Sequence, residues 1–483
     1  YPQVRTIVEM GGEDSKLITL EVEEQSQKIK ISDFTMNSIC AAGTGSFLDQ
    51  QAHRLGLTVE EFGKLALQSK NPPRIAGRCS VFAKTDMIHL QQVATPDYDI
   101  VAGLCRAVAR NFKSTLGKGK AFEKPVSFQG GVAANLGMRR AFREVLSLSE
   151  RELIIPQRFA SMGAIGAVLL VLEDSSRTMH FRGLETLKAY LDTSSAKKTK
   201  GLEPLASAGK PNGLHQSVHA VCSTRTGKTR AYLGVDVGSI STNVVVIDDQ
   251  NRVLSKRYLM TAGRPLEAIK RGLREVGEEV DNTIQVVAVG TTGSGRYLTG
   301  DFIGADVIKN EITAQATAAS VIDLRVDTIF EIGGQDSKYI SLSNGTIIDF
   351  EMNKVCAAGT GSFLEEQAEK LGISIKNEFS NLALNAPCPV SLGERCTVFM
   401  ESDLVHHQQM GADKANLIAG LSYSIALNYL NKVVGDRKVG NHIFFQGGTA
   451  FNLGVVTAFE KILNKKITVP VSYTHLRAHE TTS

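Results

Sequence analysis

The sequence predicts an α/β protein that contains two copies of one domain, the first copy lacking its N-terminal part. The composition is that of a folded globular chain, because 42% of the 483 residues are apolar and 22% are charged. Several strand-like runs rich in Val and Ile end in glycine turns that lead into a strand or a helix. Four sequence blocks occur twice in the same order, which predicts the duplication.

The charge and the cysteine usage exclude several classes of protein. A formal charge of +4 is close to neutral for this length and gives no electrostatic reason to expect nucleic acid or an anionic membrane as partner. No apolar run approaches the roughly 18 residues of a membrane span, and the first residues lack the features of a signal peptide. We therefore expect a soluble, cytoplasmic protein whose seven widely spaced cysteines are reduced. The chain does not start with Met, and we expect it to be part of a longer protein.

The repeated blocks lie 316 to 322 residues apart, and the best-matched pair is identical at 13 of 18 positions. Four matches in one order indicate a domain duplication and not a chance motif. The paired blocks are VEMGGEDSKLITL (8–20) with FEIGGQDSKYISL (330–342), TMNSICAAGTGSFLDQQA (35–52) with EMNKVCAAGTGSFLEEQA (351–368), RCSVFAKTDMIHLQQ (78–92) with RCTVFMESDLVHHQQ (395–409), and QGGVAANLG (129–137) with QGGTAFNLG (446–454).

The two copies are unequal in extent. The stretch from about 231 to 322 has no counterpart in copy one, so only copy two is expected to form a nearly complete nucleotide site. The predicted domains are the C-terminal portion of the first repeat (1–173), a linker with one short helix (174–230), a nearly complete second repeat (231–470) and a tail that does not look native (471–483).

Three segments of copy two combine a strand with glycines. A hairpin over 231–249 carries a carboxylate and bare backbone N–H groups at its tip, and 330–342 repeats this pattern. The third segment, 442–454, is a strand that ends in two glycines and enters a helix. Glycines let a phosphate approach the backbone, and a carboxylate suits magnesium or its water shell. The ordered trio predicts a nucleotide site formed by Asp236, Gly238 and Ser239, by Glu331, Gly333, Gly334, Asp336 and Lys338, and by Gly447 and Gly448.

Four of the seven cysteines recur between the copies: Cys40 with Cys356, and Cys79 with Cys396. Two thiolates per copy make four in the chain, which suits a 4Fe–4S cluster or a structural zinc ion. Zinc ligands normally come in close pairs such as C-x-x-C, whereas these cysteines are about 40 residues apart within each copy. The helix predicted after Cys356 is expected to present free N–H groups that would stabilise an anionic cluster.

The segments DVGSISTNVVVID, EIGGQDSK, CAAGTGSFL, RCTVFMESD and QGGTAFN resemble the ATPase activators of 2-hydroxyacyl-CoA dehydratases and the BadF/BadG/BcrA/BcrD-type ATPases. The resemblance is greatest to the long, duplicated members. It implies tandem actin/Hsp70/sugar-kinase-like ATPases built from RNase-H-like lobes that bind ATP or ADP with Mg²⁺. It also implies catalytic roles for Asp236, Glu331 and Asp336, although the family commonly has Asp where this chain has Glu331.

The resemblance further implies that Cys40, Cys79, Cys356 and Cys396 hold one 4Fe–4S cluster, either across an intrachain pseudo-dimer or between two chains. Its implied function is electron transfer from a ferredoxin- or flavodoxin-like reductant to an iron–sulfur dehydratase or reductase of CoA thioesters, driven by ATP. Two alternatives stay open: a sugar-kinase-like phosphotransferase without a cluster, and a zinc-bound scaffold with an ATPase fold.

Overall fold

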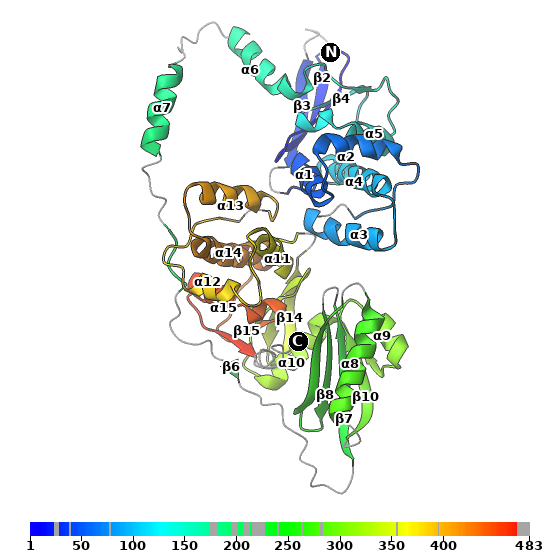
Figure 1. Cartoon of the computed structure of the whole chain (residues 1–483), viewed down its shortest axis with the longest axis vertical. Helices are drawn as coiled ribbons and strands as arrows, with labels where there is room; N and C mark the ends of the chain where they lie inside the picture. The colour runs from blue at the N-terminus through cyan, green and yellow to red at the C-terminus, as the bar shows by residue number, and fades with distance from the viewer. Residues whose placement is uncertain are drawn as a thin grey trace. The chain divides into compact units, whose positions relative to one another are not determined.

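The structure is a computed structural model (Figure 1) that describes residues 1–23, 29–37, 40–76, 79–173, 182–194, 201–205, 213–214, 228–238, 241–261, 264–280, 284–353, 356–394 and 396–470. Ser239, the tail 471–483 and much of the predicted linker therefore lie outside the described residues. The chain forms two compact units, and we describe each by itself. The first unit contains Tyr1–Leu202 together with Arg395–Gly411, and the second contains Glu203–Glu394 and Ala412–Ser483.

All three main sheets share one strand order. In each sheet three strands form an antiparallel meander, a fourth strand pairs in parallel with the first, and a fifth pairs in parallel with the fourth. The third sheet has a sixth strand, which pairs in parallel with the fifth. The first unit contains one such sheet and the second unit contains two. The α/β fold with repeated lobes of one topology is thus confirmed. The sheet orders are β3-β2-β1-β4-β5, β11-β10-β7-β8-β9 and β14-β13-β12-β15-β16-β6.

The first unit has its sheet and most of its helices in copy one (Figure 1). Its strands are β1 (Thr6–Met10), β2 (Ser15–Val22), β3 (Ile29–Asn37), β4 (Val126–Gln129) and β5 (Leu153–Ile154). Its helices are α1 (Gly45–Arg54), α2 (Val59–Leu65), α3 (Ser80–Gln92), α4 (Asp97–Phe112), α5 (Leu136–Leu146), α6 (Met162–Glu173), α7 (Gly183–Ser194) and, from copy two, α13 (Phe399–Gln409). Helix α7 occupies the part of the linker where a short helix was predicted.

The second unit consists of two lobes, each with one sheet. The strands of the first lobe are β7 (Thr229–Val237), β8 (Ser241–Asp248), β9 (Val253–Met260), β10 (Ile284–Thr292) and β11 (Val307–Ile308). Those of the second lobe are β12 (Thr328–Ile332), β13 (Ser337–Ser343), β14 (Thr346–Met352), β15 (Ile443–Gln446), β16 (Ile467–Pro470) and the linker strand β6 (Gly213–Leu214). The helices are α8 (Pro265–Val280), α9 (Arg296–Ile303), α10 (Glu311–Ile322), α11 (Gly361–Lys370), α12 (Phe379–Leu384), α14 (Lys414–Tyr429) and α15 (Leu453–Leu463).

Sequence patterning explains how these elements bury their apolar faces. Strand β8 alternates buried and half-buried positions along its whole length, the period of two expected for a strand with one face in a core. Helix α14 is buried at twelve of its sixteen positions and packs beside α12 and α15. Aromatic rings close the core of the second lobe, where Phe330 of β12 lies 5.2 Å from Tyr429 and 5.4 Å from Phe459 between ring centroids.

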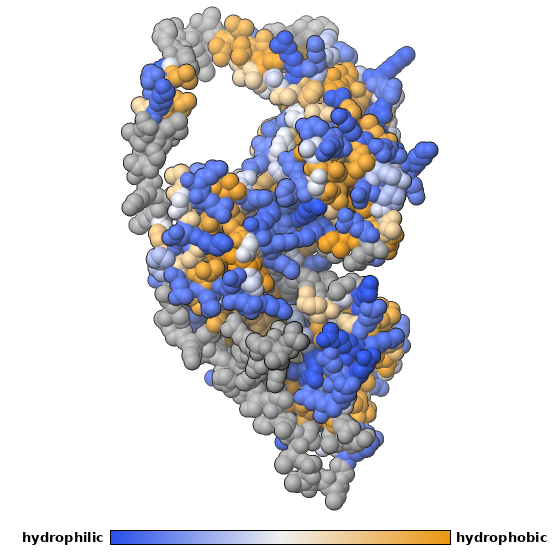
Figure 2. Space-filling model, viewed as in Figure 1, coloured by the Kyte–Doolittle hydropathy of each residue, from blue (hydrophilic) through white to orange (hydrophobic). Residues whose placement is uncertain are grey.

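Helix α6 is an exception to this burial. It is apolar over almost its whole length, yet none of its residues is buried, and Leu170 and Leu172 are 67% and 72% exposed. The hydrophobic surface of this helix is visible in Figure 2. In the part of the chain that the structure describes, no helix combines the length and the apolar character needed to cross a membrane.

Candidate functional site

The first predicted phosphate loop starts at Asp236, near the end of β7. Asp236 faces Asn243 of β8 in the antiparallel register and is hydrogen-bonded to that side chain. Burial raises the pKa of Asp236, the nearby Glu311 raises it further, and Lys338 opposes this shift. The backbone N–H of Gly238 donates to the carbonyl oxygen of Ser241 over 2.8 Å, which closes the hairpin.

The second loop places Glu331 and Lys338 opposite each other on β12 and β13. The Nζ of Lys338 lies 2.9 Å from Oε2 of Glu331, and these side chains are only 5% and 10% exposed. Burial raises the pKa of Glu331, with Lys338 opposing and Asp236 and Asp336 adding to the rise. Burial opposes the charge on Lys338, but Glu331, Asp336 and Glu311 together raise its pKa. Lys338 is thus a buried cation within a carboxylate cluster, and not a solvated surface lysine.

The equivalent residues of copy one form the same ion pair in a more exposed setting. Lys16 Nζ lies 2.9 Å from Oε2 of Glu9, with side chains 35% and 22% exposed. The strand register is also the same, because Glu9 pairs with Lys16 and Gln129 as Glu331 pairs with Lys338 and Gln446.

The Gly333–Gly334 turn after β12 is bound to the helix that follows Cys356. The N–H of Gly333 donates to the carbonyl of Asp336 over 2.8 Å. The N–H groups of Gly361 and Ser362, the first two residues of α11, then donate over 2.8 Å each to the carbonyls of Gly333 and Gly334. The expectation that the helix start offers free N–H groups to a cluster is therefore wrong for these two groups, because the turn accepts them.

The third predicted segment lies directly against the second. Gly447 has a φ of +86°, and a Cβ at this position would lie 2.5 Å from the carbonyl oxygen of Ile332, so only glycine fits here. Gly448 is exposed, and a Cβ at this position would lie 3.5 Å from the Tyr258 hydroxyl of the other lobe. Asn452 caps α15 by accepting hydrogen bonds from the N–H groups of Gly454 and Val455.

The second unit therefore brings the predicted nucleotide-site residues into one charged cluster. Glu331 and Lys338 interact electrostatically with each other and with both Asp236 and Asp336, although Asp236 belongs to one lobe and the other three belong to the second. The cluster has more carboxylates than ammonium groups, an excess that a bound divalent cation would offset. Ser239 lies outside the described residues, so the structure does not place it.

Sequence reasoning missed three residues of this cluster. Glu311 at the start of α10 contributes a further negative charge, and Arg296 at the start of α9 lies 3.3 Å from it. Gly293, with a φ of +86°, lets the backbone approach Asp236, because a Cβ there would lie 2.4 Å from Asp236 Oδ1. The signal that would have found them is GTTGSGR at 290–296, a glycine-rich loop directly after a strand.

Two of the predicted ligand cysteines meet in the first unit, one from each copy. The thiol of Cys40 is hydrogen-bonded to Cys396, and this bond lowers the pKa of Cys396 to about 6. Burial opposes the shift, and the backbone N–H of Ala41 adds to it. Ala41 packs with Cys396, Val398 and Phe399 in a small apolar cluster. A lowered pKa favours the thiolate, which is the form that binds metals.

The other two predicted ligands occupy matching positions in their copies. Cys79 is buried and directly precedes α3, whereas the equivalent Cys396 is also buried but lies three residues before Phe399, the first residue of α13. Cys356 is half-buried and lines a cavity of about 240 Å³ together with Asn353 and Glu351. Among the described residues, no group of three or more His, Cys, Asp or Glu side chains is close enough to hold a metal ion. Of the four cysteines, Cys40 and Cys396 are brought together within the first unit.

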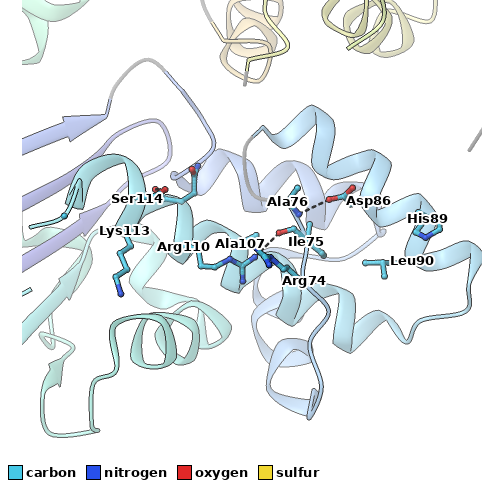
Figure 3. Close-up of a pocket in the computed structure, with 12 residues that line it drawn as sticks. Arg74, Ile75, Ala76, Asp86, His89, Leu90, Ala107, Arg110, Lys113 and Ser114 are labelled. Atoms are coloured by element: carbon cyan, nitrogen blue, oxygen red, sulfur yellow. Dashed lines mark hydrogen bonds between the residues drawn. The ribbon is translucent and has the colours of Figure 1, made fainter. Parts of the chain in front are cut away.

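Another cavity, of about 890 Å³, lies in copy one (Figure 3). Arg110 on its wall donates to the carbonyl of Ile75, and Asp86 accepts from the N–H of Ala76. Burial and the neighbouring Arg74 lower the pKa of Arg110. No sequence pattern predicts this cavity, and its lining residues include none of the predicted site residues.

The family pattern described as the BadF/BadG/BcrA/BcrD ATPase family matches residues 1–171 and 233–478. This chain belongs to that family. The two matched segments correspond to two family repeats in tandem.

Several relatives of the chain match about one half of it. The (R)-2-hydroxyglutaryl-CoA dehydratase activating ATPase of Acidaminococcus fermentans is 34% identical over 239 residues, which are 49% of this chain and 89% of that protein. An uncharacterized protein of Methanocaldococcus jannaschii is 33% identical over 247 residues, which are 49% of this chain but 58% of that protein. The crystal structure of component A of the A. fermentans dehydratase matches with 31% identity and a TM-score of 0.47, covering 50% of this chain and 92% of its own.

Proposed function

We propose that this protein hydrolyses ATP and uses the energy to pass single electrons at low potential to an iron–sulfur enzyme that acts on a CoA thioester. The electron would come from a ferredoxin- or flavodoxin-like reductant, and ATP and water would leave as ADP and phosphate. The observation that carries the proposal is the bonding of the Gly333–Gly334 turn to the helix that follows Cys356. This contact connects a phosphate-type turn with a cysteine of the repeated set. The activating ATPase of A. fermentans, to which the chain is 34% identical, supports the same role.

The nucleotide part of the proposal rests on the charged cluster of the second unit. The carboxylates of Asp236 and Asp336 would bind the magnesium ion through its water shell, because small hard cations prefer oxygen ligands and keep several waters. The backbone of Gly333 and Gly334 would approach the phosphates, and the adenosine would lie beside the exposed Gly448. Lys338 would stay protonated beside Glu331 and offset part of the negative charge while the nucleotide enters.

The electron-transfer part rests on the repeated cysteines. We assign Cys40, Cys79, Cys356 and Cys396 as the residues that would hold one 4Fe–4S cluster, because four thiolates are the donor set that such a cluster takes. The hydrogen bond between Cys40 and Cys396 fits this assignment and favours a cluster within one chain, since these thiols come from different copies. A bound cluster would supply a centre that accepts and donates one electron.

Anaerobic purification followed by iron, sulfide and zinc analysis tests the proposal. We expect about four iron and four sulfide per chain, since one 4Fe–4S cluster is assigned to the four cysteines. Cys356→Ala should lose the iron and keep nucleotide affinity. Cys388→Ala is the matched control, because Cys388 is an exposed cysteine of copy two without a cysteine counterpart, and it should keep its iron.

The metal content also separates the alternatives. Zinc in place of iron would favour a scaffold with an ATPase fold, and the absence of both metals together with sugar-dependent ATP consumption would favour a kinase. Iron that survives Cys356→Ala would refute the ligand assignment.

A further inference from the structure

Asn353 joins the phosphate-type turn to Cys356 through a single side-chain amide. Its Nδ2 donates to the carbonyl oxygen of Gln335 over 3.1 Å and to the carbonyl oxygen of Cys356 over 3.2 Å. Gln335 lies inside the turn, between Gly334 and Asp336, whereas Cys356 follows 21 residues later in the sequence. The two donor hydrogens of one amide group therefore bridge a loop proposed to contact phosphate and a residue proposed to bind the cluster.

The same side chain is fixed to the strand that follows the turn. Oδ1 of Asn353 accepts a hydrogen bond from the N–H of Ser337 over 2.8 Å, and the N–H of Asn353 donates to the carbonyl of Ser337 over 3.0 Å. These bonds hold Asn353 at the start of β13, so its amide keeps one position relative to the turn. A displacement of the turn must then move the Cys356 carbonyl or break a hydrogen bond to it.

A second contact holds the start of the helix after Cys356 against the turn. Besides the hydrogen bonds from Gly361 and Ser362, the backbones themselves touch: a Cβ on Gly361 would lie 2.8 Å from the carbonyl oxygen of Gly333 and 3.4 Å from Cα of Gly334. The distance leaves no room for a side chain, so the helix start follows the turn closely.

We propose that Asn353 is a positioning residue that transmits the state of the Gly333–Asp336 turn to Cys356. When a nucleotide phosphate binds the turn, the Asn353 amide moves the carbonyl of Cys356 and with it the thiol. The inference rests on the proposed function, because it assumes that the turn binds phosphate. It adds the residue through which nucleotide binding would reach the cysteine.

Copy one supplies a matched internal control. Asn37 occupies the equivalent position and its Nδ2 donates to the carbonyl of Cys40 over 2.8 Å. Its Oδ1 accepts from the N–H of Cys40 over 3.3 Å, so in copy one the amide group is closed onto the cysteine itself. A change at Asn37 should therefore leave the response of Cys356 to nucleotide unaltered.

The test uses the full chain without cluster and measures the alkylation rate of Cys356 by peptide mass spectrometry, with and without Mg²⁺ and a non-hydrolysable ATP analogue. Cys356 is half-buried beside its cavity, which gives the reagent access. Net hydrogen bonds of about 1 kcal/mol each predict that nucleotide changes this rate about fivefold or more. Asn353→Asp keeps the acceptor for Ser337 but removes both donors, so the ratio of the two rates should fall close to one while nucleotide affinity persists.

Each result bears on the proposal. Asn37→Asp should keep the wild-type ratio at Cys356, and Asn353→Gln, which retains the amide, should restore part of it. A wild-type ratio retained in Asn353→Asp, or a loss of nucleotide binding in that variant, overturns the positioning role. A wild-type chain that binds nucleotide with a ratio of one overturns the link while the proposed ATPase stands. A wild-type chain that binds no nucleotide overturns both.

Discussion

The two Glu–Lys ion pairs of this chain allow the cost of burial to be measured within one protein. Lys338–Glu331 and Lys16–Glu9 have the same N–O distance of 2.9 Å and the same place in the strand register. They differ in exposure, which is 5% and 10% for the first pair and 35% and 22% for the second. The substitutions Lys338→Met and Lys16→Met remove the same charge from the two environments.

The structure predicts unequal costs for these substitutions. Removing one partner of a buried pair leaves an uncompensated charge and costs about 3 kcal/mol or more. Glu331 would also face the carboxylates of Asp236 and Asp336 without its counterion. Removing one partner of a half-exposed pair costs under about 1 kcal/mol, because water solvates the remaining carboxylate.

Hydrogen exchange measured by peptide mass spectrometry resolves the two sites, since each copy gives its own peptides. About 3 kcal/mol corresponds to a loss of protection of about a hundredfold in the strands β12 and β13, against less than about tenfold in β1 and β2 for Lys16→Met. The double variant Glu331→Gln with Lys338→Met should recover most of the lost protection, because no buried charge is left unpaired. Equal losses in the two copies, or no recovery in the double variant, would refute the reasoning.

The same variants predict a dependence on pH. Burial raises the pKa of Glu331, and the loss of Lys338 removes the interaction that opposes this rise. A carboxyl group with a higher pKa in the folded chain binds its proton more tightly when folded, so stability falls as the pH rises between the unfolded and folded values. Lys338→Met should therefore regain protection in β12 and β13 when the pH is lowered from 7 to 5. A loss that is the same at both values would contradict this assignment.

Two further predictions concern the cysteines and the glycine beside Asp236. Because Cys40 and Cys396 are hydrogen-bonded, mild oxidation of the cluster-free chain with diamide should form a Cys40–Cys396 disulfide within one chain. Mass spectrometry would detect it as a linked peptide pair, and Cys40→Ser should prevent it. A dimer linked through Cys40 would contradict the intrachain pairing. Gly293→Ala should weaken nucleotide binding, measured by calorimetry, because its Cβ would lie 2.4 Å from Asp236 Oδ1. Gly304→Ala is the control, because Gly304 has a φ of +68° but open space around it. This control should lose about 1–2 kcal/mol of stability through backbone strain and keep its nucleotide affinity.

The sequence predicts the parts of the site that lie close together along the chain. The turn that contains Gly333, Gly334 and Asp336 follows from a strand, two glycines and a second strand, all within 330–342. The confirmed α/β fold with repeated lobes follows in the same way from repeated blocks. The domain boundaries, the nucleotide-site roles and the four-cysteine ligand set stay predictions.

Contacts that depend on distant segments were harder to predict. The sequence around Lys338 does not indicate that its ammonium group is buried against Glu331. That burial depends on the packing of α14, whose Tyr429 hydroxyl donates to the carbonyl of Lys338 over 2.7 Å. Neither does any local pattern indicate that Arg395–Gly411 packs with the first unit and brings Cys396 to Cys40.

The two copies share the hydrogen bonds that join the glycine turn to the helix after the cysteine. Copy one has the same bonds between its turn and its helix, from Gly45 to Gly11 and from Ser46 to Gly12, each 2.8 Å. The bonding of turn to helix is therefore the same in both copies, although the Glu–Lys pair beside the turn is buried in copy two and more exposed in copy one. In each copy these bonds hold the start of the helix that follows Cys40 or Cys356 against the glycine turn.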